Sequence, residues 1–439
     1  MDKKTIRNLL IIIISIGILI RILSIFFIQF ENLQIDTGIN PDVQINYEKI
    51  ITQDESSLYK NGTVDYILQL FYTHKLYQNN LLLAYHPPLF FFLCAIVLSI
   101  SLLFTKEAYL LLLSINFFIL ILSLLSILVF TKIMKEVGFS SLDVLLPLSL
   151  SFFIPLHIYM SRLVTNDQLV FLFSLILLLC LIKWYKNPKM KYIILGSLAL
   201  GLGGMSKTSI VVMLIPMAYV FFKKYYMLSK AKDIQKTSML YKHLVVLFLI
   251  ASPLFLWYPL RNYVLFNQPL FYVTSPDENL AVKSTNFIDR WLINKEIISD
   301  NYYKDDSNIL SGVIKLSIIF DELPLRMNSL VFIPLMILII FMIILSIIGI
   351  FKGKNNYKDI IFVTYISWII SFIYFNIRFP YSCTFHPRYI VMPIYMSYIF
   401  IQLLLNSTNN KLFKKIVFTT SVATILLSLL SCINMMMIF

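Results

Sequence analysis

The polar side chains most able to do chemistry in this sequence stand beside long apolar segments. They form six short motifs, some with carboxylates and others with cations. These motifs hold Asp36 and Asp42; His86-Pro87-Pro88; Thr165-Asn166-Asp167; Lys207; Arg261-Asn262; and His386-Pro387-Arg388-Tyr389. A carboxylate can accept the proton of an attacking hydroxyl, and cations can hold a phosphate or another anion. On one face of a fold, the motifs would form a proton-accepting, anion-binding cleft.

The segments between these motifs have the composition of membrane helices. The chain of 439 residues is 59% hydrophobic and 14% charged. Apolar runs of roughly 20 residues recur, and this length crosses about 30 Å of hydrocarbon. We therefore predict an all-α polytopic membrane protein. The first apolar run follows MDKKTIRN and no small-residue cleavage site comes after it, so we interpret it as a retained helix with a cytoplasmic N-terminus.

The placement of the lysines predicts the orientation of these helices. The formal charge is +14, and lysines gather in short clusters between apolar runs, which is typical of cytoplasmic loops rather than of nucleic-acid binding. The clusters at 132–135, 183–191, 223–242, 352–358 and 411–415 all face the cytoplasm only if the apolar run 87–104 does not cross; if it crossed, all of them would lie outside. We expect this run to form a helix in the outer interface, since proline is well tolerated at a helix start.

This topology predicts about eleven crossings and places the six polar motifs on the outer side. The first crossing is about 7–30, and the others are about 108–131, 142–161, 168–184, 192–205, 208–222, 244–260, 327–351, 359–377, 389–405 and 416–436. The short runs 192–205 and 208–222 are joined by a turn at Ser206-Lys207-Thr208. We predict a module over 1–260 with a first outer loop at 31–107, a second outer loop at 261–326 and C-terminal helices over 327–439.

Each polar motif also has a purely structural explanation. Aspartates in outer loops, such as Asp36, are usually just solvated. Arg261 and Arg388 at helix ends could extend their charges to lipid headgroups. Asp167 precedes an apolar run, where it can stabilise the start of a helix. Lys207 is harder to explain structurally, because a lysine near the bilayer centre costs about 2.5–3.5 kcal/mol on insertion scales.

Five motifs together resemble those of the polytopic GT-C glycosyltransferases of the protein-mannosyltransferase and aminoarabinose-transferase type (glycosyltransferase family 39). The resemblance covers about residues 1–400. The matching segments, in chain order, are Tyr85-His86-Pro87-Pro88-Leu89 (the HPPL element), Asn166-Asp167-Gln168-Leu169 (NDxL), Gly204-Met205-Ser206-Lys207-Thr208 (the "LTK" turn), Trp257 through Asn262 ("W..RN"), and Arg388-Tyr389 with Pro393 (RYxxP).

The resemblance implies an inverting transfer of a sugar from a polyprenyl-phosphate donor to an acceptor on the outer face of the plasma membrane. The acid of the family's first outer loop is best matched by Asp36, although the second acid of its usual Asp-Glu pair is missing. Asp42 therefore remains a competitor. Asp54-Glu55 matches the dipeptide but lies further from the first helix.

The resemblance also implies roles for the other motifs. Asp36 would be the catalytic base, and Asp167 would be a second acid that positions the acceptor or a metal. Donor phosphate would be held by Lys207, Arg261 and Arg388, with support from His86, Asn166 and Tyr389. No cofactor is required with certainty, and a divalent metal ion stays open. The acceptor could be a protein, a glycan or a lipid.

Other classes of protein also have many helices and a polar cleft. A transporter or lipid flippase is the main alternative, followed by an outer-face glycan polymerase or ligase and a non-catalytic scaffold. Transporters tend to carry ionisable or helix-breaking residues at mid-bilayer, often in paired repeats. Here the informative charges lie at the outer helix ends and the sequence has no visible internal repeat, which favours the transferase.

Overall fold

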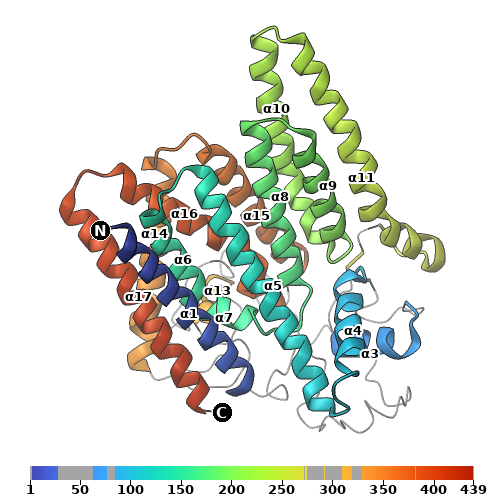
Figure 1. Cartoon of the computed structure of the whole chain (residues 1–439), viewed down its shortest axis with the longest axis horizontal. Helices are drawn as coiled ribbons and strands as arrows, with labels where there is room; N and C mark the ends of the chain where they lie inside the picture. Colours follow the sequence, from blue (N-terminus) through green and yellow to red (C-terminus); the bar gives the residue numbers. More distant parts are fainter. Residues whose placement is uncertain are drawn as a thin grey trace. The chain divides into compact units, whose positions relative to one another are not determined.

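The computed structural model describes residues 2–27, 63–76, 85–270, 272–273, 291, 309–318, 329–380 and 382–438. These residues form helices and no strand, which confirms the predicted all-α class (Figure 1). Within them, nine helices are long and apolar enough to cross a membrane. Two predicted crossings, 142–161 and 192–205, coincide with shorter apolar helices at Ser141–Phe153 and Met190–Gly204, so the count of eleven stays a prediction.

The chain divides into two compact units, each assembled from separate parts of the sequence. Unit 1 consists of Met1–Asn32, Val137–Arg162 and Ser275–Phe439, and unit 2 consists of Leu33–Glu136 and Leu163–Thr274. Both units are therefore interleaved along the chain. The segment that leads into Asp167 leaves unit 1 at Arg162 and enters unit 2 at Leu163.

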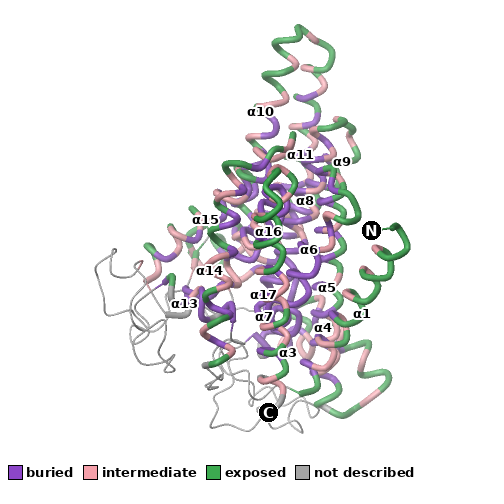
Figure 2. Tube along the Cα trace, turned by 90° about the vertical axis from the view of Figure 1, so that its left-hand side faces the viewer, coloured by how far each residue is buried: buried purple, intermediate pink, exposed green. Residues whose placement is uncertain are grey.

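Unit 1 is a bundle around a mostly buried helix, α16 (Figure 2). Its helices are α1 (Lys3–Phe27), α6 (Ser141–Phe153), α7 (Pro155–Met160), α13 (Ile309–Ile318), α14 (Ser329–Lys352), α15 (Lys358–Arg378), η6 (Ser382–Phe385), η7 (Pro387–Ile390), α16 (Val391–Ser407) and α17 (Lys411–Ile438). Helices α6, α14 and α15 pack against α16, and α17 packs against α14.

One predicted helix of unit 1, 142–161, is broken into α6 and α7. The break falls at Pro155, whose missing N–H is tolerated at the first position of a helix. Without that N–H, the carbonyl of Ser151 lacks its usual partner four residues on. Arg21 of α1 replaces it: Nη2 donates to Ser151 O over 2.9 Å and Nη1 donates to Phe152 O over 2.8 Å.

A second arginine, Arg162, follows α7 and donates a hydrogen bond back to α1. Arg162 Nη1 donates to the carbonyl of Ser24 on α1 over 2.9 Å, and the Ser24 hydroxyl donates to the carbonyl of Arg21 over 2.8 Å. Both guanidinium groups are fully buried. Close approach here depends on Gly17, because a Cβ at that position would lie 2.2 Å from the Phe152 ring. Helix α1 is therefore fixed to the segment that precedes Asp167.

Unit 2 is built from long helices together with several short ones. Its helices are α3 (Thr63–Thr73), α4 (Leu89–Ser101), α5 (Ala108–Val137), α8 (Asp167–Lys186), α9 (Met190–Gly204), η3 (Thr208–Met213), α10 (Leu214–Lys230) and α11 (Ile234–Phe266). Helix α9 packs against both α8 and α11, and α3 packs against α4. At Gly204 a Cβ would lie 2.1 Å from the Phe255 ring of α11, so this position requires glycine.

Two boundaries in unit 2 bear on the predicted topology. Helix α4 has 13 residues, or about 20 Å, which is too short to span the hydrocarbon core and supports the prediction of a non-crossing helix. Helix α11 was predicted to end near residue 260, which was wrong. It continues through Pro253 and Pro259 to Phe266, so Arg261 and Asn262 lie in its last turns.

We expect Arg21→Met to lower the free energy of unfolding by about 2–4 kcal/mol, because the buried carbonyls of Ser151 and Phe152 lose the charged donor that Arg21 supplies. Thermal or chemical unfolding of the purified protein would measure this loss. Arg7→Gln, at an exposed position of the same helix, is the matched control and should have little effect. Equal stability of the two variants would contradict the structural role of Arg21.

Candidate active site

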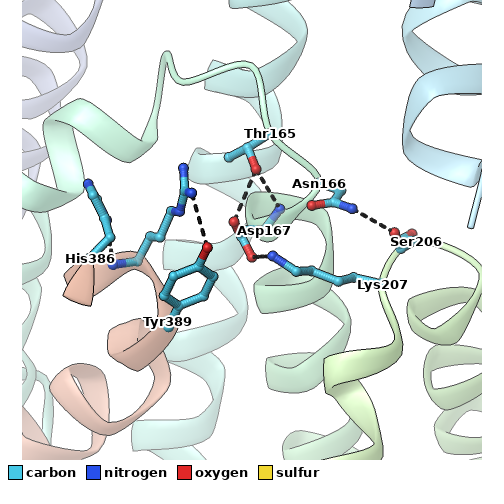
Figure 3. A network of polar contacts seen from close by, with 8 residues as sticks. Thr165, Asn166, Asp167, Ser206, Lys207, His386 and Tyr389 are labelled. Carbon is cyan, nitrogen blue, oxygen red and sulfur yellow. Dashed lines mark hydrogen bonds and ion pairs between the residues drawn. The ribbon is translucent and has the colours of Figure 1, made fainter. Parts of the chain in front are cut away.

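The centre of the candidate site is an ion pair in unit 2 between Lys207 and Asp167 (Figure 3). Lys207 Nζ lies 2.5 Å from Asp167 Oδ1, and the two side chains are only 15% and 9% exposed. Lys207 belongs to the turn between α9 and η3, as the sequence predicted. Asp167 is the first residue of α8, where the helix dipole favours a carboxylate.

The loop that precedes α8 holds Asp167 in place. Thr165 Oγ1 donates to Asp167 Oδ2 over 3.0 Å, so each carboxylate oxygen has a partner. Asn166 stands at the helix N-cap position, but its side chain does not cap the helix. Its Nδ2 instead donates to the carbonyl of Ser206 over 3.0 Å. This bond ties the aspartate loop to the lysine turn.

The same turn also anchors the start of α4. The backbone N–H of Leu89, directly after Pro87-Pro88, donates to the carbonyl of Met205 over 2.9 Å. Lys207 itself is extended, with φ −161°, and its backbone N–H donates to Gly203 O over 2.9 Å. Three motifs that are far apart in the sequence (HPPL, NDQL and MSKT) therefore meet around one turn of unit 2.

His86 belongs to this group through its position before α4. Its ring lies 4.0 Å from that of Tyr85, centroid to centroid. Burial and the nearby Lys207 ammonium hold the pKa of His86 well below its ordinary value of 6.5. His86 is therefore neutral at pH 7, so it can offer both a hydrogen-bond donor and an acceptor to a ligand.

Arg261 lies in the same unit on an aromatic surface. Its guanidinium carbon is 5.5 Å from the Tyr258 ring centroid and 5.4 Å from that of Phe266. The buried Tyr258 hydroxyl lies 3.3 Å from the hydroxyl of Tyr66, whose ring stacks on Phe91 at 4.3 Å. Helices α3, α4 and α11 therefore meet beneath the arginine.

Sequence reasoning missed Tyr66 and Tyr258, since 26 tyrosines occur along the chain and nothing in their spacing separates these two. The structure alone identifies them, because it brings their buried hydroxyl groups together from α3 and α11. What distinguishes these two tyrosines is that their side chains are buried, and a single sequence does not reveal the burial of a particular tyrosine.

Unit 1 contains the other predicted phosphate-binding residue, Arg388, at η7. His386 caps this short helix, with its Nδ1 accepting the Arg388 N–H over 2.9 Å. Arg388 Nη2 donates to the Tyr389 hydroxyl over 3.1 Å, and its guanidinium carbon lies 5.0 Å from the Tyr389 ring (Figure 3). The His386 ring faces Tyr159 of α7, at 5.8 Å between centroids. Tyr389 thus orients the arginine.

The predicted site residues fall into three groups. His86, Asn166, Asp167, Lys207 and Arg261 lie in unit 2, whereas Arg388 and Tyr389 lie in unit 1. Asp36 and Asp42 lie outside the described residues. Among the residues that the structure describes, no group of three or more His, Cys, Asp or Glu side chains could hold a metal ion.

Comparison with known proteins gives a family match for part of the chain. The sequence profile of the family described as "Dolichyl-phosphate-mannose-protein mannosyltransferase" matches residues 85–257, which include the HPPL, NDQL and MSKT motifs. This match confirms the resemblance to glycosyltransferases of this type over residues 85–257. No curated protein matches the chain.

Among solved structures, the chain is similar to the apo-state crystal structure of ArnT from Cupriavidus metallidurans. The sequence identity is 13% and the TM-score is 0.49, and the similarity covers 93% of this chain. The chain spans 62% of the length of that protein.

We predict that the Lys207–Asp167 pair is energetically coupled. A double-mutant cycle with Lys207→Met, Asp167→Asn and the double variant should give a coupling free energy of about 1–3 kcal/mol, because each single change removes the opposite charge from a partner that stays buried. The exposed pair Lys236–Asp233 is a matched control and should give less than about 1 kcal/mol. Equal coupling in both cycles would contradict the prediction.

We also predict that His86 makes stability depend on pH. Below about pH 6.5 the unfolded chain binds a proton that folded His86 resists, so the free energy of unfolding falls as pH decreases, by up to about 1.4 kcal/mol per pH unit. Denaturation at about pH 7.5 and about pH 5.5 would measure this loss. His86→Gln should reduce it, whereas His74→Gln, at an exposed histidine, should not.

Proposed function

We propose that this multi-pass membrane protein transfers a sugar from a polyprenyl-phosphate-linked donor to an acceptor on the outer face of the plasma membrane, with inversion at the anomeric carbon. The acceptor class is a protein, a glycan or a lipid. The observation that carries the proposal is the buried Lys207–Asp167 pair at the turn where three motifs of the matched family meet.

Lys207 has the features needed to bind the donor phosphate. Its ammonium group is a cation held in a mostly buried position beside Asp167. A lipid phosphate leaves with a negative charge, so a cation held in a dry site stabilises the transition state more than it would in water. Arg261 and Arg388 are proposed to supply further positive charge for the donor phosphate.

Asp167 is proposed to position groups rather than to accept the proton. One of its oxygens holds Lys207 and the other accepts the hydroxyl of Thr165. This arrangement fixes the ammonium group where the phosphate would bind. The carboxylate is proposed to orient the acceptor hydroxyl as a hydrogen-bond acceptor.

The proton acceptor is proposed to be Asp36, with Asp42 as the alternative. The acceptor oxygen attacks the anomeric carbon opposite the phosphate, and the bond from that carbon to the phosphate oxygen breaks. Its electron pair leaves with the phosphate, and the hydroxyl proton passes to the aspartate. His86, as a neutral donor and acceptor beside Lys207, is proposed to hold the first outer loop against this site.

We expect sugar release from radiolabelled undecaprenyl-phosphate sugars by the purified protein in nanodiscs, tested with a panel of sugars. Asp36→Asn should lower the rate by about 10²–10⁴-fold if Asp36 is the base, and Asp42→Asn should do so if Asp42 is. Lys207→Met should also lower the rate. Glu107→Gln, at an exposed carboxylate of the first outer region, is the matched control.

The outcomes separate the candidates. Loss in only one of the two aspartate variants identifies the base, and turnover that survives both changes means that neither aspartate is the base. If folded protein leaves every donor intact, even with membrane extract as a source of acceptors, the transferase proposal fails. A lipid-flipping assay would then test the transporter class.

A further inference from the structure

A hairpin of unit 2 carries exposed positive charge at the end of α10 and the start of α11. Helix α10 ends at Lys230 and α11 begins at Ile234, and the chain between them makes a tight turn in which Lys232 has φ +53°. We call the exposed residues Lys230, Lys232, Lys236 and Lys242 the hairpin lysines.

The hairpin extends beyond the neighbouring helices of the same unit (Figure 1). From the Lys207 turn, α9 has 15 residues, whereas η3 and α10 together have 23. The excess of eight residues corresponds to about 12 Å at a rise of about 1.5 Å per residue. A headgroup layer is roughly 5–8 Å thick on each side of the bilayer. The hairpin is thus long enough to cross this layer.

The charge of this region is strongly unbalanced. Residues 223–242 hold six lysines and a single acid, Asp233, which pairs with Lys236 at 2.8 Å. Within the described part of the chain, no ion pair is present at Lys230, Lys232 or Lys242. Three of the four hairpin lysines, Lys230, Lys232 and Lys242, therefore remain available to an anion.

A second lysine cluster lies beside the hairpin. It consists of Lys183 and Lys186 in the last turn of α8, Lys189 in the connection to α9, and Lys191 in the first turn of α9. Lys224 of α10 donates to the carbonyl of Tyr185 over 2.9 Å, which joins the two clusters. Because Lys224 has this internal role, it does not belong to the proposed binding group.

Exposed apolar side chains begin directly beside the lysines. On α11, Tyr241 and Lys242 are followed by exposed Val245, Phe248 and Leu249, which are 57%, 61% and 68% exposed. On α10, the 73% exposed Phe222 lies two turns before Lys230. Apolar residues of this exposure in a membrane helix contact lipid, and tyrosine is typical of the interface. The hairpin lysines thus lie within two turns of a lipid-facing surface.

We propose that the hairpin lysines bind the phosphodiester headgroups of anionic glycerophospholipids, such as phosphatidylglycerol, in the leaflet that surrounds α10 and α11. The continuous order of lipid-facing apolar residues, tyrosine and lysine favours a membrane lipid over a soluble polyanion. Each lysine near such a surface contributes about fivefold to affinity. This proposal does not depend on the catalytic one, because it concerns a different surface of the protein.

The test compares lipid binding by the full chain and by two quadruple variants in detergent. The first changes Lys230, Lys232, Lys236 and Lys242 to Gln. The second changes exposed Lys352, Lys411, Lys414 and Lys415 of unit 1 to Gln, which removes the same charge elsewhere. Retention of phosphatidylglycerol against phosphatidylcholine, measured by native mass spectrometry and by the shift in Tm, is the readout. We expect at least about a tenfold loss of phosphatidylglycerol affinity in the first variant alone.

Three outcomes would overturn the proposal. These are an equal loss in both variants, no loss in either, or binding of soluble glycerol phosphate or a short RNA as tight as that of the lipid. Changing the four hairpin lysines to Arg keeps the charge and should retain binding, so it separates loss of a site from loss of folding. If the Gln variant does not fold, Lys230→Gln with Lys242→Gln gives the same comparison with two charges.

Discussion

A charge or an unpaired backbone group inside a membrane protein must find a partner within the protein, because hydrocarbon offers none. The structure meets this constraint at two places. Arg21 and Arg162 are fully buried and donate to carbonyls on each other's segments. Lys207 meets the carboxylate of Asp167 in a second partly dry environment. The polar interior of each unit is arranged around these contacts.

The proline at position 155 explains why Arg21 is needed. A continuous helix would satisfy its own carbonyls, but the break at Pro155 leaves that of Ser151 without its helical partner. Arg21 supplies the replacement from α1, 130 residues away in the sequence. The break also redirects the chain into α7, whose Tyr159 faces His386 beside Arg388. One backbone interruption therefore shapes the segments on which the predicted functional residues stand.

The two ends of unit 2 have different chemistry. At one end, a few polar groups meet around the Lys207 turn, and each described contact among them is specific and short. At the other end, many lysines are exposed and have few acidic neighbours. The first arrangement suits recognition of a single phosphate, and the second suits weak, summed attraction to a charged surface. The long apolar helices between them keep the two polar regions apart.

The sequence by itself determined the class of fold and the composition of the site. Apolar runs of membrane length, lysine clusters and the motifs around His86, Asp167 and Lys207 could all be identified because they depend on local composition and order. The ends of α11 and the break between α6 and α7 could not be identified from the sequence. Proline can start a helix, bend it or lie within it, depending on what packs beside it.

The tertiary structure was also needed to find three contacts. These are the Lys207–Asp167 pair, the hydrogen bond from Asn166 to Ser206 and the stacking of Tyr66 on Phe91. These contacts join residues 25 to 40 positions apart, and only the packing of α9 on α8 and of α3 on α4 sets such distances.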